Sequence, residues 1–434
     1  MQKSIANLSA FLITAITPIV FFPCLGRSDS FTCKFFFMGL VTIFFLFALV
    51  REAVPTERLE LEGMPVKCLA LYALLVAVSL VLSEDPVMGF LGYTGRLDGY
   101  LTLLFYIAIF FIGRACDDPS DLFYKGIALA AMIVSLFVLC EIAGYRPYTS
   151  FVFRKIRFTA ATGTMGNRNF LGTYLATTMP VHFYLAFYRK KYFYYATLLL
   201  SASALAAAQA RGPWLALAFG ILFYLVRFLR KHDRRFLILI PILGALFFGA
   251  IAMMNRRLSI PFLSRFLSIF RDAKAFFLHG FDATKAGSHR VFVWGKSWEL
   301  VKKSPLIGYG PENMQLAMRK FFYDDVVAEI GRYLNYDKAH NEYLNIAVTS
   351  GLPSLAVYLA FVTSSLKDAA KKLARPEIET LFIAVVIYLV QAFFNISVPN
   401  TAYIFWLFLG LLSREGMPRA WDTEPCADEE DDRT

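Results

Sequence analysis

Long apolar runs follow one another along most of this chain, and they constrain its fold more than any other feature. A helix needs roughly 17–25 apolar residues to cross the hydrocarbon core of a bilayer, and about a dozen segments approach that length. The candidate spans are Leu8–Leu25, Lys34–Val50, Val66–Leu82, Gly99–Gly113, Gly126–Ala143, Asn169–Tyr188, Tyr192–Ala210, Pro213–Phe228, Phe236–Met254, Asn341–Val362, Ile378–Asn395 and Asn400–Leu412. Over the whole chain 57% of residues are hydrophobic and only 18% are charged, far from the balance of a soluble domain. We therefore expect an integral membrane protein.

The fold class follows from how backbone polar groups are satisfied in lipid. A helix pairs these groups within its own segment, and no part of the sequence alternates with the two-residue period of a transmembrane barrel. The sequence predicts an all-α fold, a transmembrane helical bundle of about 12 spans with one large extracytoplasmic helical loop. The expected divisions are helices over 1–254, the loop over 255–340, further helices over 341–415 and an acidic cytoplasmic tail over 416–434.

The basic loops predict the orientation. If the N-terminus is cytoplasmic, strict alternation places the clusters Arg189–Lys191, Arg227–Arg235 and Lys367–Arg375 on the same side. Short cytoplasmic loops carry an excess of Lys and Arg, so this arrangement is the favoured one. The basic segment Arg146–Arg168 is an exception, because it then lies outside. The net charge of +11 is thus explained by orientation and lipid phosphate, and we expect no nucleic-acid partner.

The predicted outer loop contains a candidate amphipathic helix. Asn255–Lys338 carries 14 Lys and Arg against 8 Asp and Glu, so the loop is locally cationic. Within it an apolar stripe at helical spacing faces a polar side, and the two sets are Val291, Trp294, Trp298 and Val301 against Lys296, Glu299 and Lys303. Ser304-Pro305 and the glycines Gly308 and Gly310 should end this helix.

Two arginines are candidates for anion binding. Arg211 stands between two apolar runs with almost no loop around it, where a guanidinium costs several kcal/mol unless it is paired or faces water. The alternative is a snorkelling residue at a helix end. Arg290 opens the amphipathic helix, and guanidinium groups bind phosphate oxygens in a bidentate way. The alternative there is an ordinary surface arginine.

Other polar residues fall on the same predicted outer side. His340 stands where the loop re-enters the membrane, and a neutral imidazole can accept a proton from a hydroxyl; a structural role is the alternative. Asn167 and Asn169 precede a span and could line a polar mouth or form a helix-capping turn. The outer loops lack an Asp-x-Asp pair, so we expect no metal site.

In combination these segments resemble the O-antigen ligase and O-antigen polymerase superfamily, membrane glycosyltransferases that use polyprenyl-diphosphate-linked glycans. The segments that match in order are Gly166-Asn167-x-Asn169, Ala210-Arg211-Gly212-x-Trp214, Arg290-x3-Trp294 leading into Pro305-Leu306-x-Gly308-x-Gly310, and Ala339-His340-Asn341-Glu342-Tyr343-Leu344 before Gly351-Leu352. Asn395-x-Ser397 and Phe405-Trp406 also look like the family. The resemblance covers roughly residues 160 to 412; many relatives carry Ser where Ala210 stands.

The resemblance implies a specific reaction. Such enzymes transfer a glycan from its polyprenyl-diphosphate carrier to an acceptor hydroxyl on a glycan, lipid or protein, outside the bacterial cytoplasmic (inner) membrane. They work by inverting displacement without a metal or other cofactor. By the same resemblance Arg211 and Arg290 hold the diphosphate, His340 is the base on the acceptor, and Asn167, Asn169 and Asn341 bind substrate. Fixed cations are what a metal-free site needs for a leaving diphosphate.

Other classes of function also fit a polytopic chain. A transporter or lipid-linked glycan flippase is the alternative, because intramembrane arginines suit carriers of anions. Against it, the polar residues gather in one external loop, and no inverted repeats are evident. A structural subunit of an envelope complex is a third class. Within the first class, ligase and polymerase both stay open.

Overall fold

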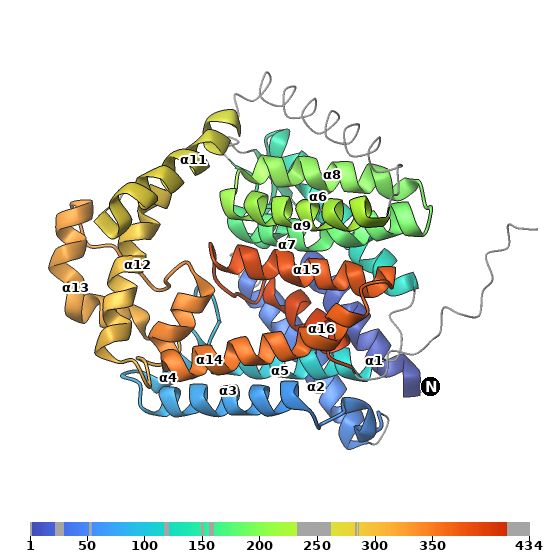
Figure 1. The fold of residues 1–434 in the computed structure, drawn as a ribbon, viewed down its shortest axis with the longest axis horizontal. Helices are drawn as coiled ribbons and strands as arrows, with labels where there is room; N and C mark the ends of the chain where they lie inside the picture. Colours follow the sequence, from blue (N-terminus) through green and yellow to red (C-terminus); the bar gives the residue numbers. More distant parts are fainter. Residues whose placement is uncertain are drawn as a thin grey trace, which may run out of the picture.

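The apolar runs fold into helices. The computed structural model describes residues 2–21, 30–51, 54–116, 121–148, 152–155, 160–231, 262–282, 284 and 286–414. Its α-helices are α1 (Gln2–Phe11), α2 (Ser30–Val50), α3 (Met64–Val81), α4 (Pro86–Leu91), α5 (Tyr100–Ala115), α6 (Asp121–Ile142), α7 (Arg168–Phe183), α8 (Phe193–Ala208), α9 (Arg211–Lys231), α11 (Phe262–His279), α12 (Ala286–Lys303), α13 (Met314–Ile330), α14 (Glu342–Lys371), α15 (Pro376–Ala392) and α16 (Ala402–Leu412). Figure 1 shows their arrangement.

Short elements complete the chain. Single turns of 3₁₀- or π-helix are Leu12–Ile16, Thr17–Ile19, Thr56–Leu59, Gly163–Met165, Tyr184–Tyr188 and Gly280–Asp282. The all-α expectation has one exception, an antiparallel hairpin of β1 (Tyr145–Tyr148) and β2 (Val152–Lys155), in which Tyr145 pairs with Lys155. The hairpin falls at the start of the basic segment that the sequence predicted as a loop. Its short strands carry no alternating pattern long enough to reveal them.

Within the part of the chain that the structure describes, four helices are long and apolar enough to cross a membrane: α2, α3, α6 and α14. Shorter apolar helices are found at Ile5–Ile19, Tyr100–Ala115, Phe193–Ala208 and Ala402–Leu412. The predicted span Phe236–Met254 and the acidic tail 416–434 lie outside the described residues. The chain is thus a helical membrane protein, whereas its division into about 12 spans and the side on which each loop lies stay predictions.

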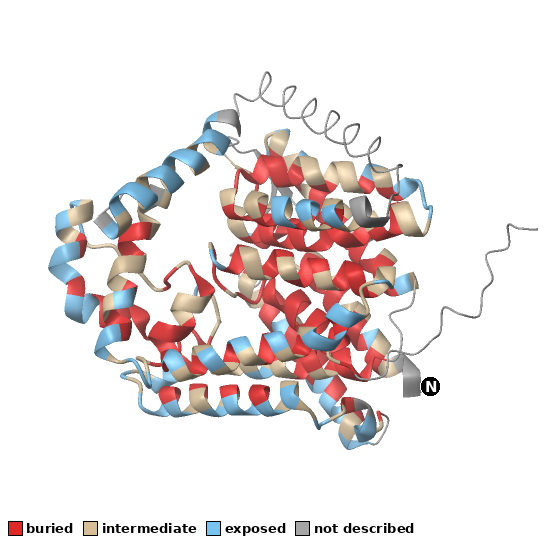
Figure 2. Cartoon of the chain, viewed as in Figure 1, coloured by how far each residue is buried: buried red, intermediate tan, exposed pale blue. Residues whose placement is uncertain are grey.

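Burial separates helices that face lipid from those at the centre. On α2, Phe36, Leu40 and Phe47 are 64%, 65% and 62% exposed, which suits contact with lipid tails. By contrast every residue of α16 is buried, as expected for a helix that is apolar all round. Figure 2 shows this central core. The predicted short last span is therefore a central core helix.

Two groups of helices create the setting of the site. α14 packs along α3, α16 along α5, and α15 against α7 and α9. α11, α12 and α13 lie together at one end of the molecule (Figure 1), where α12 contacts both α11 and α14. The predicted helix is found as α12, which ends at Lys303, just before Ser304-Pro305. Of its predicted apolar stripe, Val291 and Val301 are buried, whereas Trp298 is 41% exposed.

Candidate functional site

A cavity of about 660 Å³ lies where α9, α11, α12 and α14 meet. Most of its wall is apolar, and the lining includes Phe276, Trp294, Trp298, Leu344, Phe393 and Phe394. Its charged lining residues are Arg211, Asp272 and Arg290, and Asn341 adds an amide. Segments that are distant in the sequence thus place two of the predicted site arginines on one cavity.

Arg211 is the first residue of α9 and is held by α11. Its Nη1 donates hydrogen bonds to Ser268 Oγ at 2.9 Å and to Asp272 Oδ2 at 2.5 Å. Asp272 Oδ2 also accepts the backbone N–H of Gly287 at 3.1 Å, so one carboxylate joins the starts of α9 and α12 to α11. Arg211 is thus paired with a carboxylate at a cavity wall, whereas a snorkelling arginine would extend its guanidinium into solvent.

Arg290 lies near the start of α12 and is mostly buried. Burial lowers the pKa of Arg290 to about 10, and the nearby charges of Arg211 and Arg168 act in the same direction. The group therefore keeps its proton at neutral pH. Within the described part of the chain, its side chain makes no hydrogen bond or ion pair, unlike that of Arg211. A buried cation that lines a cavity without an acidic partner is suited to bind an anion.

His340 sits in a strained turn just before α14. Its φ of 52° is left-handed, and the next residue, Asn341, caps the helix by accepting the Leu344 N–H at 3.0 Å. Among the described residues, the buried Nδ1 of His340 has no hydrogen-bond partner. Burial lowers the pKa of His340 to about 4, and Arg290 and Arg96 add to the effect while Asp337 opposes it. The imidazole is therefore neutral at pH 7 and can accept a proton.

The relation of His340 to the cavity is indirect. Its neighbour Asn341 lines the cavity, whereas His340 is not among the lining residues. Arg290 lines the cavity and lowers the pKa of the imidazole, so the two side chains interact electrostatically.

Asn167 and Asn169 are arranged differently from the arginines. Asn167 is the N-cap of α7, and its side-chain oxygen accepts the Asn169 N–H at 2.8 Å. This is the helix-capping turn that the sequence left open, and neither asparagine lines the cavity. Their predicted part in substrate binding stays a prediction. Arg168, between them, does interact electrostatically with Arg290.

Two of the matched motifs contact each other. α14 breaks at Gly351, which adopts φ 82° and ψ 166°. The turn that contains Gly308 lies against this break, where Tyr309 N donates to Val348 O, Gly310 N to Thr349 O and Leu352 N to Pro305 O. A Cβ at Gly351 would lie 2.2 Å from Leu306 O. Glycine is required there by both the positive φ and the close approach of another backbone.

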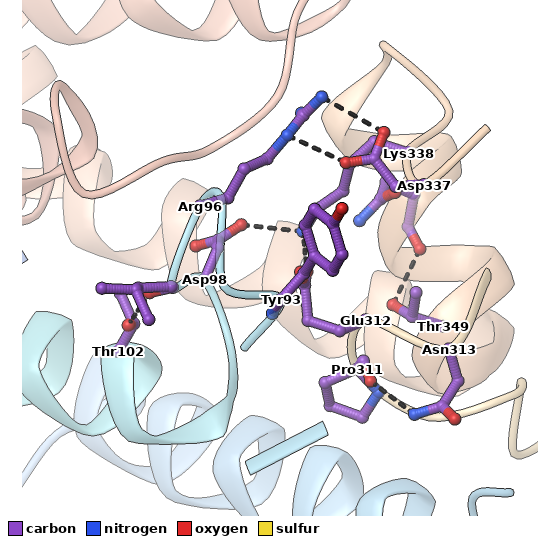
Figure 3. A network of polar contacts seen from close by, with 12 residues as sticks. Tyr93, Arg96, Asp98, Thr102, Pro311, Glu312, Asn313, Asp337, Lys338 and Thr349 are labelled. Atoms are coloured by element: carbon purple, nitrogen blue, oxygen red, sulfur yellow. Dashed lines mark hydrogen bonds and ion pairs between the residues drawn. The ribbon is translucent and has the colours of Figure 1, made fainter. Parts of the chain in front are cut away.

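A network of ion pairs next to His340 was missed from the sequence. Figure 3 shows Arg96 and Asp98, from the loop before α5, reaching toward Asp337 and Lys338. Glu312, from the turn after α12, completes the network. The available signal was the segment Tyr93–Asp98, which places Arg96 and Asp98 between two apolar segments. Asp272 was likewise missed, because its partner Arg211 is 61 residues away.

Comparison with known proteins supports one family. Residues 196–359 match the family model described as O-Antigen ligase, a stretch that runs from α8 into α14 and includes Arg211, Arg290 and His340. A search of curated proteins found no match. The matched family comprises glycosyltransferase-type membrane enzymes, which fits the apolar helices described above. Over residues 196–359, this chain is similar to the O-antigen ligase family.

Proposed function

We propose that this protein transfers a glycan from a polyprenyl-diphosphate carrier to an acceptor hydroxyl, outside the bacterial cytoplasmic membrane. The observation that carries the proposal is the shared cavity of Arg211 and Arg290. Two guanidinium groups provide the charge that a diphosphate requires. The apolar wall around them suits the polyprenyl chain or the apolar faces of sugars.

The proposed chemistry is one displacement at the anomeric carbon. The acceptor oxygen forms a bond to that carbon while the bond to the diphosphate oxygen breaks, so the configuration inverts. The electron pair leaves with the diphosphate, where Arg290 and Arg211 stabilise the growing negative charge. The proton of the acceptor hydroxyl passes to the neutral imidazole of His340.

No metal is part of the proposed mechanism. Cations already line the cavity as guanidinium groups, and these can take up the charge that a divalent ion balances in other transferases. Within the described segments, no three carboxylate, imidazole or thiol groups come together as a metal site.

The decisive experiment follows both products. Purified protein in liposomes receives a polyprenyl-diphosphate glycan and a hydroxyl acceptor, and the release of polyprenyl diphosphate is measured together with the stereochemistry of the new linkage. Equal amounts of free carrier and inverted product support the proposal. Movement of the intact donor across the bilayer without release supports the flippase alternative. If neither occurs with any acceptor class, the proposed activity is wrong.

Replacing Arg211 with lysine is expected to lower kcat/KM by about 10- to 100-fold. An ammonium group keeps the charge but cannot hold Ser268, Asp272 and an anion in the planar arrangement of a guanidinium. Steady-state transfer kinetics measure the effect. Arg319→Lys on the exposed face of α13 is the matched control and should behave as wild type. Wild-type kinetics in Arg211→Lys would support the snorkelling alternative.

Chelation is expected to leave the transfer rate within about twofold of its original value, because the proposed charge stabilisation comes from arginine side chains. The measurement compares initial rates before and after treatment with EDTA, with a metal-dependent glycosyltransferase treated in parallel to show that chelation is complete. A loss of activity that Mg²⁺ or Mn²⁺ restores would contradict the arginine mechanism.

A further inference from the structure

Three segments that are far apart in the sequence converge beside His340. They are residues 92–99 between α4 and α5, residues 310–313 after α12, and residues 337–340 before α14. Figure 3 shows the side chains that connect them. We call the set Arg96, Asp98, Glu312, Asp337 and Lys338 the ion-pair network.

The first connection is a two-point contact between Arg96 and Asp337. Arg96 Nε lies 2.9 Å from Asp337 Oδ2, and Nη2 donates to Oδ1 at 3.1 Å. The two side chains are only 21% and 16% exposed, so water screens the pair less than it screens an ion pair on an open surface. A fork of two parallel hydrogen bonds fixes direction as well as distance.

The second connection is deeper. Lys338 Nζ lies 2.8 Å from Asp98 Oδ2 and also contacts Glu312 Oε1, and all three side chains are at most 10% exposed. Burial alone would lower the pKa of Lys338, but the two carboxylates raise it above its usual value, so the lysine stays charged. Glu312 Oε2 also accepts the backbone N–H of Tyr93 at 3.2 Å, which fastens residues 310–313 to residues 92–99.

The segment before His340 is held by side-chain contacts rather than by backbone pairing. Residues 333–339 belong to no helix or strand, so no regular backbone pattern supports them. Ala339 N donates to Asn345 Oδ1 at 3.2 Å, and Asn335 Nδ2 donates to Gln315 Oε1 at 2.6 Å. Tyr333 stacks on Tyr323 of α13. The buried Nδ1 of His340 has no hydrogen-bond partner among the described residues, so this nitrogen does nothing to orient the ring. The ion-pair network adds the charged contacts at Asp337 and Lys338, which lie close to His340 in the chain.

We propose that Arg96 and Lys338 are positioning residues, which fix residues 337–340 through Asp337, Asp98 and Glu312 and thereby set the place of the His340 imidazole. This inference rests on the proposed role of His340 as the base. Neither Arg96 nor Lys338 lines the arginine cavity, and the proposal places both behind the histidine rather than on the donor.

The charges around His340 allow geometry and electrostatics to be separated. The charged groups that act on it are Arg290 from α12, Arg96 from residues 92–99, and Asp337 and Lys338 from its own segment. Wild-type transfer should be lost as the pH passes through the His340 pKa of about 4, and a first, partial loss is expected near pH 6, because burial raises the pKa of Asp98 in the network to about 6. Removing the charge of Arg96 takes away a cation that lowers the His340 pKa, so the loss that follows His340 should move to higher pH.

The test uses three substitutions in the full-length protein. Arg96→Lys keeps the charge but loses the two-point contact with Asp337, so we expect kcat to fall about 10- to 100-fold while the donor KM stays within about twofold. The acid limb, which is the low-pH side of the profile of rate against pH, should not move. Arg96→Gln should lower kcat by a similar factor and should also move the acid limb to higher pH. Asp337→Asn should lower kcat without an upward shift, because it removes a charge that raises the His340 pKa.

Controls and a second readout keep the outcome clear. Arg332→Gln removes an exposed charge from the same region and should match wild type in both kcat and acid limb. Diethyl pyrocarbonate acylates only neutral imidazole, so the labelling of His340 as a function of pH, followed by peptide mass spectrometry, gives its pKa. This readout works in every variant, including variants that transfer no glycan. An upward shift in Arg96→Gln relative to Arg332→Gln supports the contact between the network and the histidine.

The two proposals can fail separately. If wild-type protein transfers no glycan but the labelling shift appears, the proposed function is wrong and the network still acts on His340. If wild type is active while Arg96→Lys keeps full kcat, or the labelling of Arg96→Gln matches that of Arg332→Gln, the positioning role is wrong. If Arg96→Lys and Arg332→Gln lose activity equally, the effect is not specific to the network, and that result also overturns the inference.

Discussion

Replacing His340 with alanine is expected to lower the rate of glycan transfer by about 10²–10⁴-fold, the usual contribution of a general base. Its imidazole is neutral at pH 7, because burial lowers the pKa to about 4 and Arg290 keeps positive charge nearby. Alanine removes the only proposed proton acceptor, so the acceptor hydroxyl must attack without losing its proton to the protein. Initial rates of polyprenyl diphosphate release at pH 7 measure the effect.

The control for this experiment is His279→Ala on the exposed end of α11, which should retain wild-type activity. Equal expression and unchanged thermal stability in detergent would show that His340→Ala still folds. Full activity of His340→Ala would exclude the proposed base and leave the arginine cavity as a binding site only.

Replacing Arg290 with alanine is expected to lower kcat/KM by about 10²–10³-fold, as does the loss of one preorganised group that stabilises charge. Arg290 should matter more than Arg211. The charge of Arg211 is already balanced by Asp272, whereas no acidic partner of Arg290 is found among the described residues. Its full charge is thus available to the leaving diphosphate.

The matched control is Arg271→Ala, which removes an exposed arginine from α11 next to the same cavity. It should leave both kcat and the donor KM near their wild-type values. Arg290→Lys should recover only part of the loss, because the ammonium forms a point contact. An Arg290→Ala enzyme with kcat/KM within threefold of wild type would exclude Arg290 from the diphosphate site.

The helices could be predicted from the sequence because the apolar runs are long and the breaks are marked. Ser304-Pro305 ends α12 where expected, and α14 begins beside the predicted start of its span. The sequence did not reveal which apolar helix faces lipid. α2 and α16 both look apolar, yet α16 is entirely buried and α2 exposes several phenylalanines. That difference arises from packing against neighbouring helices.

The site was predictable only in part, for a similar reason. Arg211 stands out in the sequence as a charge between two apolar runs, and Arg290 stands out as a charge at the start of a helix. The structure places both on one cavity. Asp272, which pairs with Arg211, and the residues of the ion-pair network do not stand out in the sequence, because pairing depends on contacts across the fold. Arg96 and Asp337, for example, are 241 residues apart. Asn167 matched the motif, but its side chain caps α7.

The break in α14 has a mechanical consequence. In an unbroken helix the carbonyl oxygen of Val348 would accept the N–H of Leu352, whereas Thr349 lies four residues before Pro353, which has no N–H to donate. Here the two carbonyl oxygens accept the N–H groups of Tyr309 and Gly310 instead. The first turns of α14 are thus fastened to the segment that follows α12 and, through the hydrogen bond that Ser79 Oγ donates to Thr349 O at 2.7 Å, also to α3, so the break in α14 joins its two neighbours.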